Sequence, residues 1–192
     1  MVAMQLWLQH RIAELTSKED GAAAVEYGLL VAGIAALLKD DGVAVIEAPY
    51  VKDLIDHCEF DTIYHEHFSY FSCTAVDALA RRHGLFLNAV EHFPALQGGT
   101  LRWHLGHRED VQPSARSFLD AEKVHGLTSF RYYREFGARV EKIRSDLREL
   151  LGGLKAQGAS IAGYGAAAKG STLLNFTGVD GDLLDYVVDR NT

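Results

Sequence analysis

The spacing of apolar positions changes along this chain, and each change predicts a different element. Residues 31–42 are mostly small and apolar and end in a polar turn, which predicts a helix. The next run, Val43–Ile46, has no polar position, so we expect a strand that is buried on both faces. Thr74–Gly84 predicts another helix, because it has a possible N-cap in Thr74, two arginines near its C-terminal end and a final glycine.

The following residues predict two strands and a long helix. Leu85–Val90 and Thr100–Leu105 have the composition of strands and are joined through Gly98-Gly99. Thr128–Leu154 predicts an amphipathic helix, because its apolar positions recur at alternating steps of three and four residues. We assign this apolar stripe to packing rather than to a cofactor site: Tyr133, Phe136, Val140, Ile143, Leu147, Leu150 and Leu154.

A glycine-rich turn follows the long helix. A short apolar strand runs into Gly163-Tyr164-Gly165 and then into a helix that contains Lys169. Glycines at a strand-to-helix turn let backbone N–H groups approach a phosphate, and the helix N-terminus favours an anion. The pattern is neither a Walker loop nor a complete Gly-x-Gly-x-x-Gly, so a tight turn without a ligand is an equal alternative. Asp185–Arg190 predicts the strand that completes one βαβ unit.

Composition and charge are those of an ordinary globular protein and exclude some functions. Of the 192 residues, 48% are hydrophobic and 23% charged, enough for one or two small cores. The formal net charge of −7 argues against a general nucleic-acid binder, which needs a basic face. Cys58 and Cys73 have neither the number nor the spacing for a zinc site or a disulfide framework. We therefore expect no metal site and a reducing, cytoplasmic location.

The run Tyr64-His65-Glu66-His67 contains the strongest candidate chemistry. It places a phenol, two imidazoles and a carboxylate in four residues, with Phe68, Tyr70 and Phe71 directly after them. Groups that carry charge or donate protons cost free energy to bury, so an apolar segment that holds four of them usually has a use. The alternative is a solvated loop whose histidines have no role. The remaining histidines from position 57 onward, His92 among them, follow no pattern.

The first thirty residues resemble a small bacterial Flp-type pilin. A polar, amphipathic leader, Met1–Asp20, precedes Gly21 and an apolar helix with Glu26-Tyr27 near its start. The resemblance implies cleavage after Gly21 and pairing of the Glu26 carboxylate with the N-terminal amine of a neighbouring subunit. An alanine-rich soluble helix is the alternative. The apolar run Ala22–Leu38 has 17 residues, which is at the lower limit of about 17–25 for a membrane span.

Two other segments resemble sugar C-methyltransferases that act on nucleotide-linked keto-deoxysugars. These are Glu47–Ser72 and Ala162–Asn175, and the resemblance extends over about residues 31–192. It implies an α/β fold: a partial class I methyltransferase (Rossmann-like) sheet, a long linking helix and the start of a second Rossmann-like βαβ unit. It also implies an S-adenosylmethionine-dependent C-methyltransferase (EC 2.1.1.-) whose partner is a nucleotide-linked keto-sugar.

The resemblance also implies a role for each candidate residue. A base removes the proton next to the ketone, and the resulting enolate attacks the methyl group; His67 would be this base. Tyr64 and Glu66 would bind the sugar and stabilise the developing enolate oxygen. The turn residues Gly163, Tyr164, Gly165 and Lys169 would bind the nucleotide of the substrate. If the segment is extended, His65 points away from Tyr64 and Glu66, so we expect it to be structural.

Departures from the family pattern limit what we expect of the chain alone. No Gly-x-Gly cofactor loop precedes Val31, and the cysteine-rich zinc-binding domain of the family is missing. We therefore expect an inactive fragment, because proximity and orientation supply much of the rate of a two-substrate transfer. Both resemblances include residues 31–35, so we interpret the chain as a junction of two genes, either a fusion or an assembly artefact. The expected domains are 1–38 (pilin-like), 39–110 (catalytic), 111–157 (helical linker) and 158–192 (truncated Rossmann-like).

Two functions of other classes stay open at this point. One is a pilin-like pilus subunit with an appended enzyme-derived domain, associated with the inner membrane through residues 22–38. The other is a nucleotide-binding module without catalysis that uses only the turn at Gly163–Lys169. Processing after Gly21 would favour the first, and nucleotide affinity that depends on Lys169 but not on His67 would favour the second.

Overall fold

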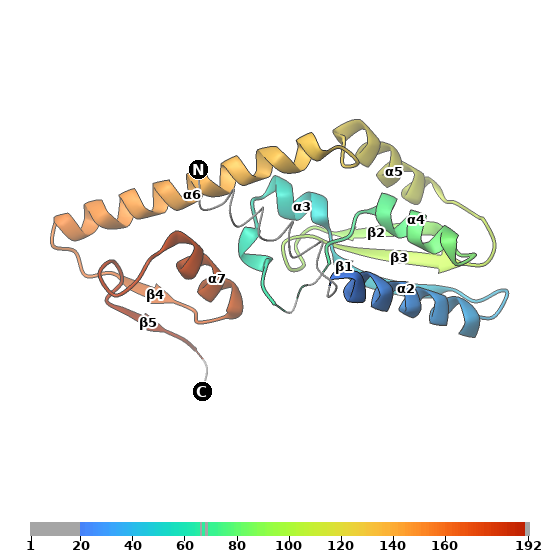
Figure 1. Ribbon diagram of the computed structural model, residues 1–192, viewed down its shortest axis with the longest axis horizontal. Helices are drawn as coiled ribbons and strands as arrows, with labels where there is room; N and C mark the ends of the chain where they lie inside the picture. The colour runs from blue at the N-terminus through green and yellow to red at the C-terminus, as the bar shows by residue number, and fades with distance from the viewer. Residues whose placement is uncertain (1–19, 66, 68, 191–192) are drawn as a thin grey trace. The chain divides into compact units, whose positions relative to one another are not determined.

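The computed structural model describes residues 20–65, 67 and 69–190, and side chains from Gly28 onward. The chain divides into two compact units (Figure 1). Unit 1 comprises Met1–Asp53 and Ser69–Tyr132, and unit 2 comprises Leu54–Phe68 and Tyr133–Thr192. Both contain helices and strands, so the predicted mixed α/β fold is confirmed.

Unit 1 contains a three-stranded sheet in the order β1-β3-β2, with antiparallel neighbours. Its elements are α2 (Asp20–Leu37), β1 (Ala44–Pro49), α4 (Cys73–Arg82), β2 (Phe86–Phe93), β3 (Thr100–Gly106) and α5 (Pro113–His125). The predicted antiparallel pair joined through Gly98-Gly99 is therefore confirmed. Gly99 has a φ of +123°, and a Cβ there would lie 2.1 Å from Oδ2 of Asp53. Only glycine fits this turn, because the carboxylate of Asp53 occupies the place of a side chain.

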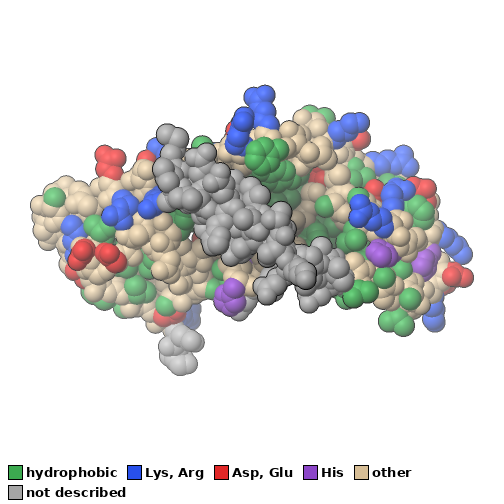
Figure 2. All heavy atoms as spheres, in the orientation of Figure 1, with side chains coloured by type: hydrophobic (Ala, Val, Ile, Leu, Met, Phe, Trp, Pro, Cys, Tyr) green, Lys and Arg blue, Asp and Glu red, His purple; other side chains and the backbone are tan. Residues whose placement is uncertain are grey.

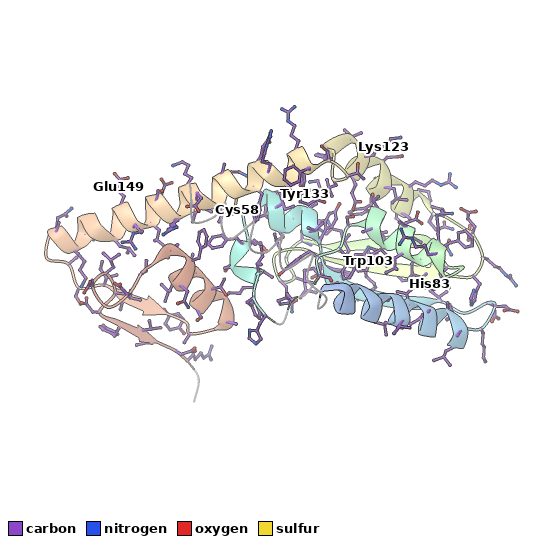
Figure 3. All side chains as sticks on the ribbon, in the orientation of Figure 1. Cys58, His83, Trp103, Lys123, Tyr133 and Glu149 are labelled. Atoms are coloured by element: carbon purple, nitrogen blue, oxygen red, sulfur yellow. The ribbon has the colours of Figure 1, made fainter. Side chains whose placement is uncertain are left out.

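The core of unit 1 lies on one face of its sheet. Leu101, Trp103 and Leu105 alternate along β3 and are at most 1% exposed, as expected for strand residues that share a face. Figure 3 labels Trp103 on this strand. Helices α2, α4 and α5 contribute Val31, Ala80 and Ala115 to the same core, so the three helices share this apolar centre with the strands.

The opposite face of the sheet is charged, and it explains why one strand prediction was wrong. We expected Val43–Ile46 to be buried on both faces, but Val45 is 54% exposed. Strand β1 is an edge strand that pairs only with β3 among the described strands, and Val45 lies opposite His104. The next pair on this face is Glu47 and Arg102, whose Oε1 and Nε atoms are 2.6 Å apart. The apolar run thus includes a residue on a polar face.

The start of α4 is fixed by a buried carboxylate. Glu122 of α5 is 0% exposed and accepts hydrogen bonds from the Cys73 amide (2.6 Å), the Thr74 amide (2.8 Å) and the Thr74 hydroxyl (2.6 Å). The predicted N-cap was wrong: Ser72 caps the helix by accepting from the Ala75 amide, and Thr74 lies inside it. Burial and the charge of Glu122 raise the pKa of the Cys73 thiol, so this thiol stays protonated and unreactive.

Helix α2 begins at Asp20, so the leader Met1–Asp20 of the pilin resemblance lies almost wholly outside the described residues. The side chain of Glu26 is also outside them, and cleavage after Gly21 stays a prediction. From Val31 onward the helix contributes to the core of unit 1.

Among the described residues, no helix combines the length and the apolar character that crossing a membrane requires.

Unit 2 contains the greater part of the long helix α6 (Phe130–Ala156), the short 3₁₀ helix η1 (Phe60–Thr62), β4 (Ala162–Tyr164), α7 (Ala168–Thr177) and β5 (Tyr186–Val188). Strands β4 and β5 pair in parallel, so β4, α7 and β5 form the predicted βαβ arrangement. The predicted long helix is confirmed, but its apolar stripe packs only at the centre. Val140 is 4% exposed, whereas Leu150 is 58% exposed.

A short helix, α3 (Val51–Asp56), leads from unit 1 into unit 2. On the face drawn in Figure 2, basic and acidic side chains are interspersed and form no single basic patch.

The burial of Glu122 predicts a stability effect for a change that keeps its size. Glu122→Gln replaces an acceptor oxygen by an NH₂ group that faces N–H or O–H donors. We expect a loss of about 2 kcal/mol in the free energy of unfolding, because at least one buried donor loses its partner. Denaturant unfolding followed by tryptophan fluorescence measures this loss. Asp120→Asn, at an exposed position of the same helix, is the control and should change little. Equal stability of both variants would contradict the prediction.

Candidate functional site

Tyr64 and His67 form a hydrogen-bonded pair. The Tyr64 hydroxyl lies 3.0 Å from Nε2 of His67, and the two rings meet edge to face with their centroids 4.7 Å apart. Both side chains are partly buried. A phenol and an imidazole at this distance can exchange a proton, and each can also exchange one with a bound molecule.

A backbone turn brings the pair together. The amide of His67 donates to the carbonyl of Tyr64 at 3.0 Å, which closes a turn over these four residues. The extended conformation in which His65 would point away from Tyr64 is not adopted, because the segment turns. A structural role of His65 stays a prediction. Glu66, the third predicted catalytic residue, lies outside the described residues.

The chain reverses direction just before this segment. At the end of α3 the Glu59 amide donates to the Leu54 carbonyl, and the Cys58 amide donates to the Ile55 carbonyl. These are the two bonds of a Schellman motif, which places Cys58 in the left-handed position that glycine usually takes. Its φ of +58° is unfavourable for cysteine by about 1 kcal/mol or more. Other contacts must hold this reversal, because the residue itself does not favour it.

The aromatic residue after the reversal anchors the segment to α7. Phe60 is 7% exposed, and its ring centroid lies 4.9 Å from that of Phe176. The Phe176 ring makes a second contact, with Arg144 of α6, whose guanidinium lies 5.8 Å from the ring centre. Thr62, at the end of η1, is 4% exposed. The segment that carries Tyr64 and His67 is thus packed against the helices of unit 2.

The predicted turn residues lie between β4 and α7. Gly163 is opposite Val187 in the parallel pair, and Tyr164 at the end of β4 is 78% exposed. Gly165 follows with a φ of +101°, a conformation that favours glycine. Lys169 lies in the first turn of α7 and is half-buried. These four residues therefore surround one strand-to-helix turn.

Helix α7 has no side-chain cap among the described residues, because its N-cap is Ala167. Its first backbone N–H groups are therefore not satisfied by a capping side chain, which is the arrangement that suits an anion or a hydroxyl oxygen. The amide of Ala166, directly before the N-cap, donates to Oδ2 of Asp189 at 2.7 Å. We did not predict Asp189, although its position directly after the last strand was a usable signal.

A second acidic residue fixes the strand β5 to α6. One oxygen of Asp185 bonds to the ammonium of Lys155, and the other accepts from the Ile161 amide and the Ser160 hydroxyl. The Lys155 ammonium, with these two donors, lowers the pKa of Asp185 to about 2.

Unit 1 contains a titratable pair that the sequence did not indicate. Nε2 of His92 lies 2.6 Å from Oδ2 of Asp53, the carboxylate that packs against Gly99. The His92 ring also meets the rings of Tyr50 and Phe118 edge to face. These contacts join β2 to the start of α3, so we interpret the pair as structural. The pairing of His92 could not be predicted from the sequence, because its partner Asp53 is 39 residues away.

Comparison with known proteins identifies the family. The sequence profile of the C-methyltransferase C-terminal domain matches residues 95–192, which include α7 and its glycine turn. The chain belongs to this C-methyltransferase family. It is also 40% identical over 150 residues to the C-methyltransferase NovU of Streptomyces niveus. The matched part is 77% of this chain and 36% of NovU, so the chain spans little more than a third of that relative. The predicted resemblance to C-methyltransferases is confirmed.

The ion pair of Asp185 predicts a pH dependence of stability. Its folded pKa is below the unfolded value, so its contribution is present above about pH 4 and is lost as the pH falls through about 2. We therefore expect Asp185→Asn to unfold at lower denaturant concentration than the wild type at pH 6. This difference should shrink below pH 4. Unfolding midpoints from pH 6 to pH 3 measure it, with Asp182→Asn as control. A difference that grows toward low pH would contradict the assignment.

Proposed function

We propose that this chain carries the proton-transfer and substrate-nucleotide-binding parts of an S-adenosylmethionine-dependent C-methyltransferase that acts on a nucleotide-linked keto-deoxysugar. The observation that carries the proposal is the hydrogen-bonded Tyr64–His67 pair in a chain of the C-methyltransferase family. Methyl transfer to carbon needs a carbon nucleophile. A C–H group next to a ketone becomes one only when a base removes its proton.

His67 is the base in this proposal. Its imidazole takes the proton from the carbon next to the ketone, the C–H electron pair moves toward the carbonyl, and an enolate forms. Tyr64 holds Nε2 of His67 when no substrate is bound, at 3.0 Å. When the keto-sugar binds, the phenol donates instead to the enolate oxygen and leaves Nε2 for the proton. Glu66 is assigned to the sugar hydroxyls on the family resemblance alone.

The nucleotide is proposed to bind at the turn formed by Gly163, Tyr164, Gly165 and Lys169. The amides at the start of α7 and the ammonium of Lys169 suit a diphosphate. The exposed ring of Tyr164, at the end of β4, offers a flat surface on which the nucleobase can stack.

The residues of unit 1 do not fit S-adenosylmethionine. Among the described residues of this unit, no glycine-rich turn joins a strand to a helix, and β1, β2 and β3 pair in the antiparallel sense, with one isolated parallel bridge between Tyr50 and Phe71. The usual position for the methionine and ribose of that cofactor is a parallel strand followed by such a turn. We therefore propose that the chain alone removes the proton but does not complete methyl transfer.

Proton removal can be measured without the cofactor. We expect the chain to exchange the hydrogen next to the ketone of a nucleotide-linked keto-deoxysugar for deuterium in D₂O, observed by NMR. His67→Gln should lower the exchange rate about 100-fold, which is the usual size of a general-base contribution. His83→Gln, outside the site, is the matched control. With labelled S-adenosylmethionine, no methyl transfer is expected from the chain alone. Exchange that does not depend on His67 would refute its role as the base. Methyl transfer by the chain alone would refute the proposal that it cannot complete the reaction.

A nucleotide-binding module without catalysis is the second candidate, favoured by the uncapped start of α7. Both candidates predict that Lys169→Ala weakens binding of a nucleoside diphosphate about tenfold, because one charge-assisted contact is lost. Isothermal titration calorimetry measures this, with Lys142→Ala on α6 as control. Nucleotide binding by a chain with no deuterium exchange would favour the second candidate. Affinity that is unchanged in Lys169→Ala would contradict both assignments of the turn.

A further inference from the structure

Arg139, on α6, holds the chain reversal that precedes the Tyr64–His67 pair. Its Nη2 atom donates to the carbonyl of Ile55 at 2.6 Å, and its Nη1 atom donates to the carbonyl of Asp56 at 3.1 Å. These carbonyls belong to the last turn of α3, and the Ile55 carbonyl also accepts from the Cys58 amide of the Schellman motif. The planar guanidinium donates to both carbonyls from one side chain, and its charge suits a helix C-terminus.

The position of this contact gives it more than a local effect. The two carbonyls lie three and two residues before Cys58, whose left-handed conformation is unfavourable for a residue other than glycine. Beyond Cys58 the chain enters η1, which Phe60 fixes on Phe176, and it then reaches the turn of Tyr64 and His67. The segment is therefore held at two points, by Arg139 before Cys58 and by Phe176 after it. Loss of the Arg139 contact would let the chain reversal at Cys58 relax.

We propose that Arg139 is a positioning residue for the Tyr64–His67 pair. It does not touch the pair; it fixes the direction in which the chain leaves α3, and the hydrogen bond between Tyr64 and His67 depends on that direction. The significance of the pair for catalysis rests on the proposed function, but the positional dependence does not. All the contacts concerned lie within unit 2.

The chain offers a matched control. Arg134 is an exposed arginine on the same helix, and within the described part of the chain its side chain makes no hydrogen bond or ion pair. Replacing it removes the same charge and the same side chain from α6 without affecting α3. Arg139→Lys is a second informative variant, because lysine keeps the charge but lacks the planar pair of donors.

The test is the NMR signal of the His67 side-chain nitrogens in the full chain labelled with ¹⁵N-histidine, assigned with His67→Gln. Tyr64→Phe gives the position of the Nε2 signal without the hydrogen bond. In Arg139→Ala we expect the signal to move most of the way to that position, whereas Arg134→Ala leaves it unchanged. The amide signals of α7 report whether unit 2 is folded. A wild-type His67 signal in Arg139→Ala, with the α7 signals intact, would overturn the proposal.

If Arg139→Ala loses the α7 signals, the same NMR measurement on Arg139→Lys decides. A displaced His67 signal with intact α7 signals supports the proposal, and an undisplaced one overturns it. Deuterium exchange distinguishes this inference from the proposed function. A displaced His67 signal without any exchange by the wild type would keep the positioning role and remove the catalytic one. If exchange depends on His67 but is unaffected in Arg139→Ala, and the His67 signal does not move in that variant, the catalytic role is kept and the positioning role is removed.

Discussion

The packing of unit 1 depends on the carboxylate of Glu122. A carboxylate with no exposed surface is tolerated only when donors replace the water it has lost, and Cys73 and Thr74 supply three. Those donors exist in the right place only when α4 begins against α5. Because α4 also contributes to the core beneath β3, this polar contact sets the depth at which the helix packs. Burial, with the charge of Glu122, also raises the pKa of the Tyr50 phenol, which keeps this neighbouring group neutral.

Unit 2 organises the candidate chemistry, although the residues concerned come from two distant parts of the chain. The segment with Tyr64 and His67 follows α3, yet its contacts are with α6 and α7, more than 70 residues later along the sequence. The same α7 begins at the glycine turn. Phe176 near its C-terminal end packs on Phe60, so α7 supports the segment that carries Tyr64 and His67. The proposed base and the proposed nucleotide site therefore share one structural support.

The sequence predicted what local patterns determine. The strand Thr100–Leu105 and the long helix were found because alternation and helical spacing are repeated within each element. The turn at Gly165 was found because its conformation favours glycine. Partners far apart in sequence were not found. Thr74 was assigned as a cap because nothing nearby shows that Glu122, 48 residues away, takes its hydroxyl. Arg139 was missed for the same reason, since a charge on an amphipathic helix does not reveal which carbonyls it will meet.

The charges around the glycine turn limit what it can bind. Lys169 contributes one positive charge and the start of α7 about half of one, while Asp189 contributes one negative charge beside the Ala166 amide. These three charges sum to only about half a positive charge, so a phosphate gains little from general attraction and depends on Lys169. A sugar hydroxyl, in contrast, can donate to Asp189 and accept from a backbone amide. The nucleotide sugar of the proposed function has both groups, and its phosphate and hydroxyls together suit this turn better than either alone.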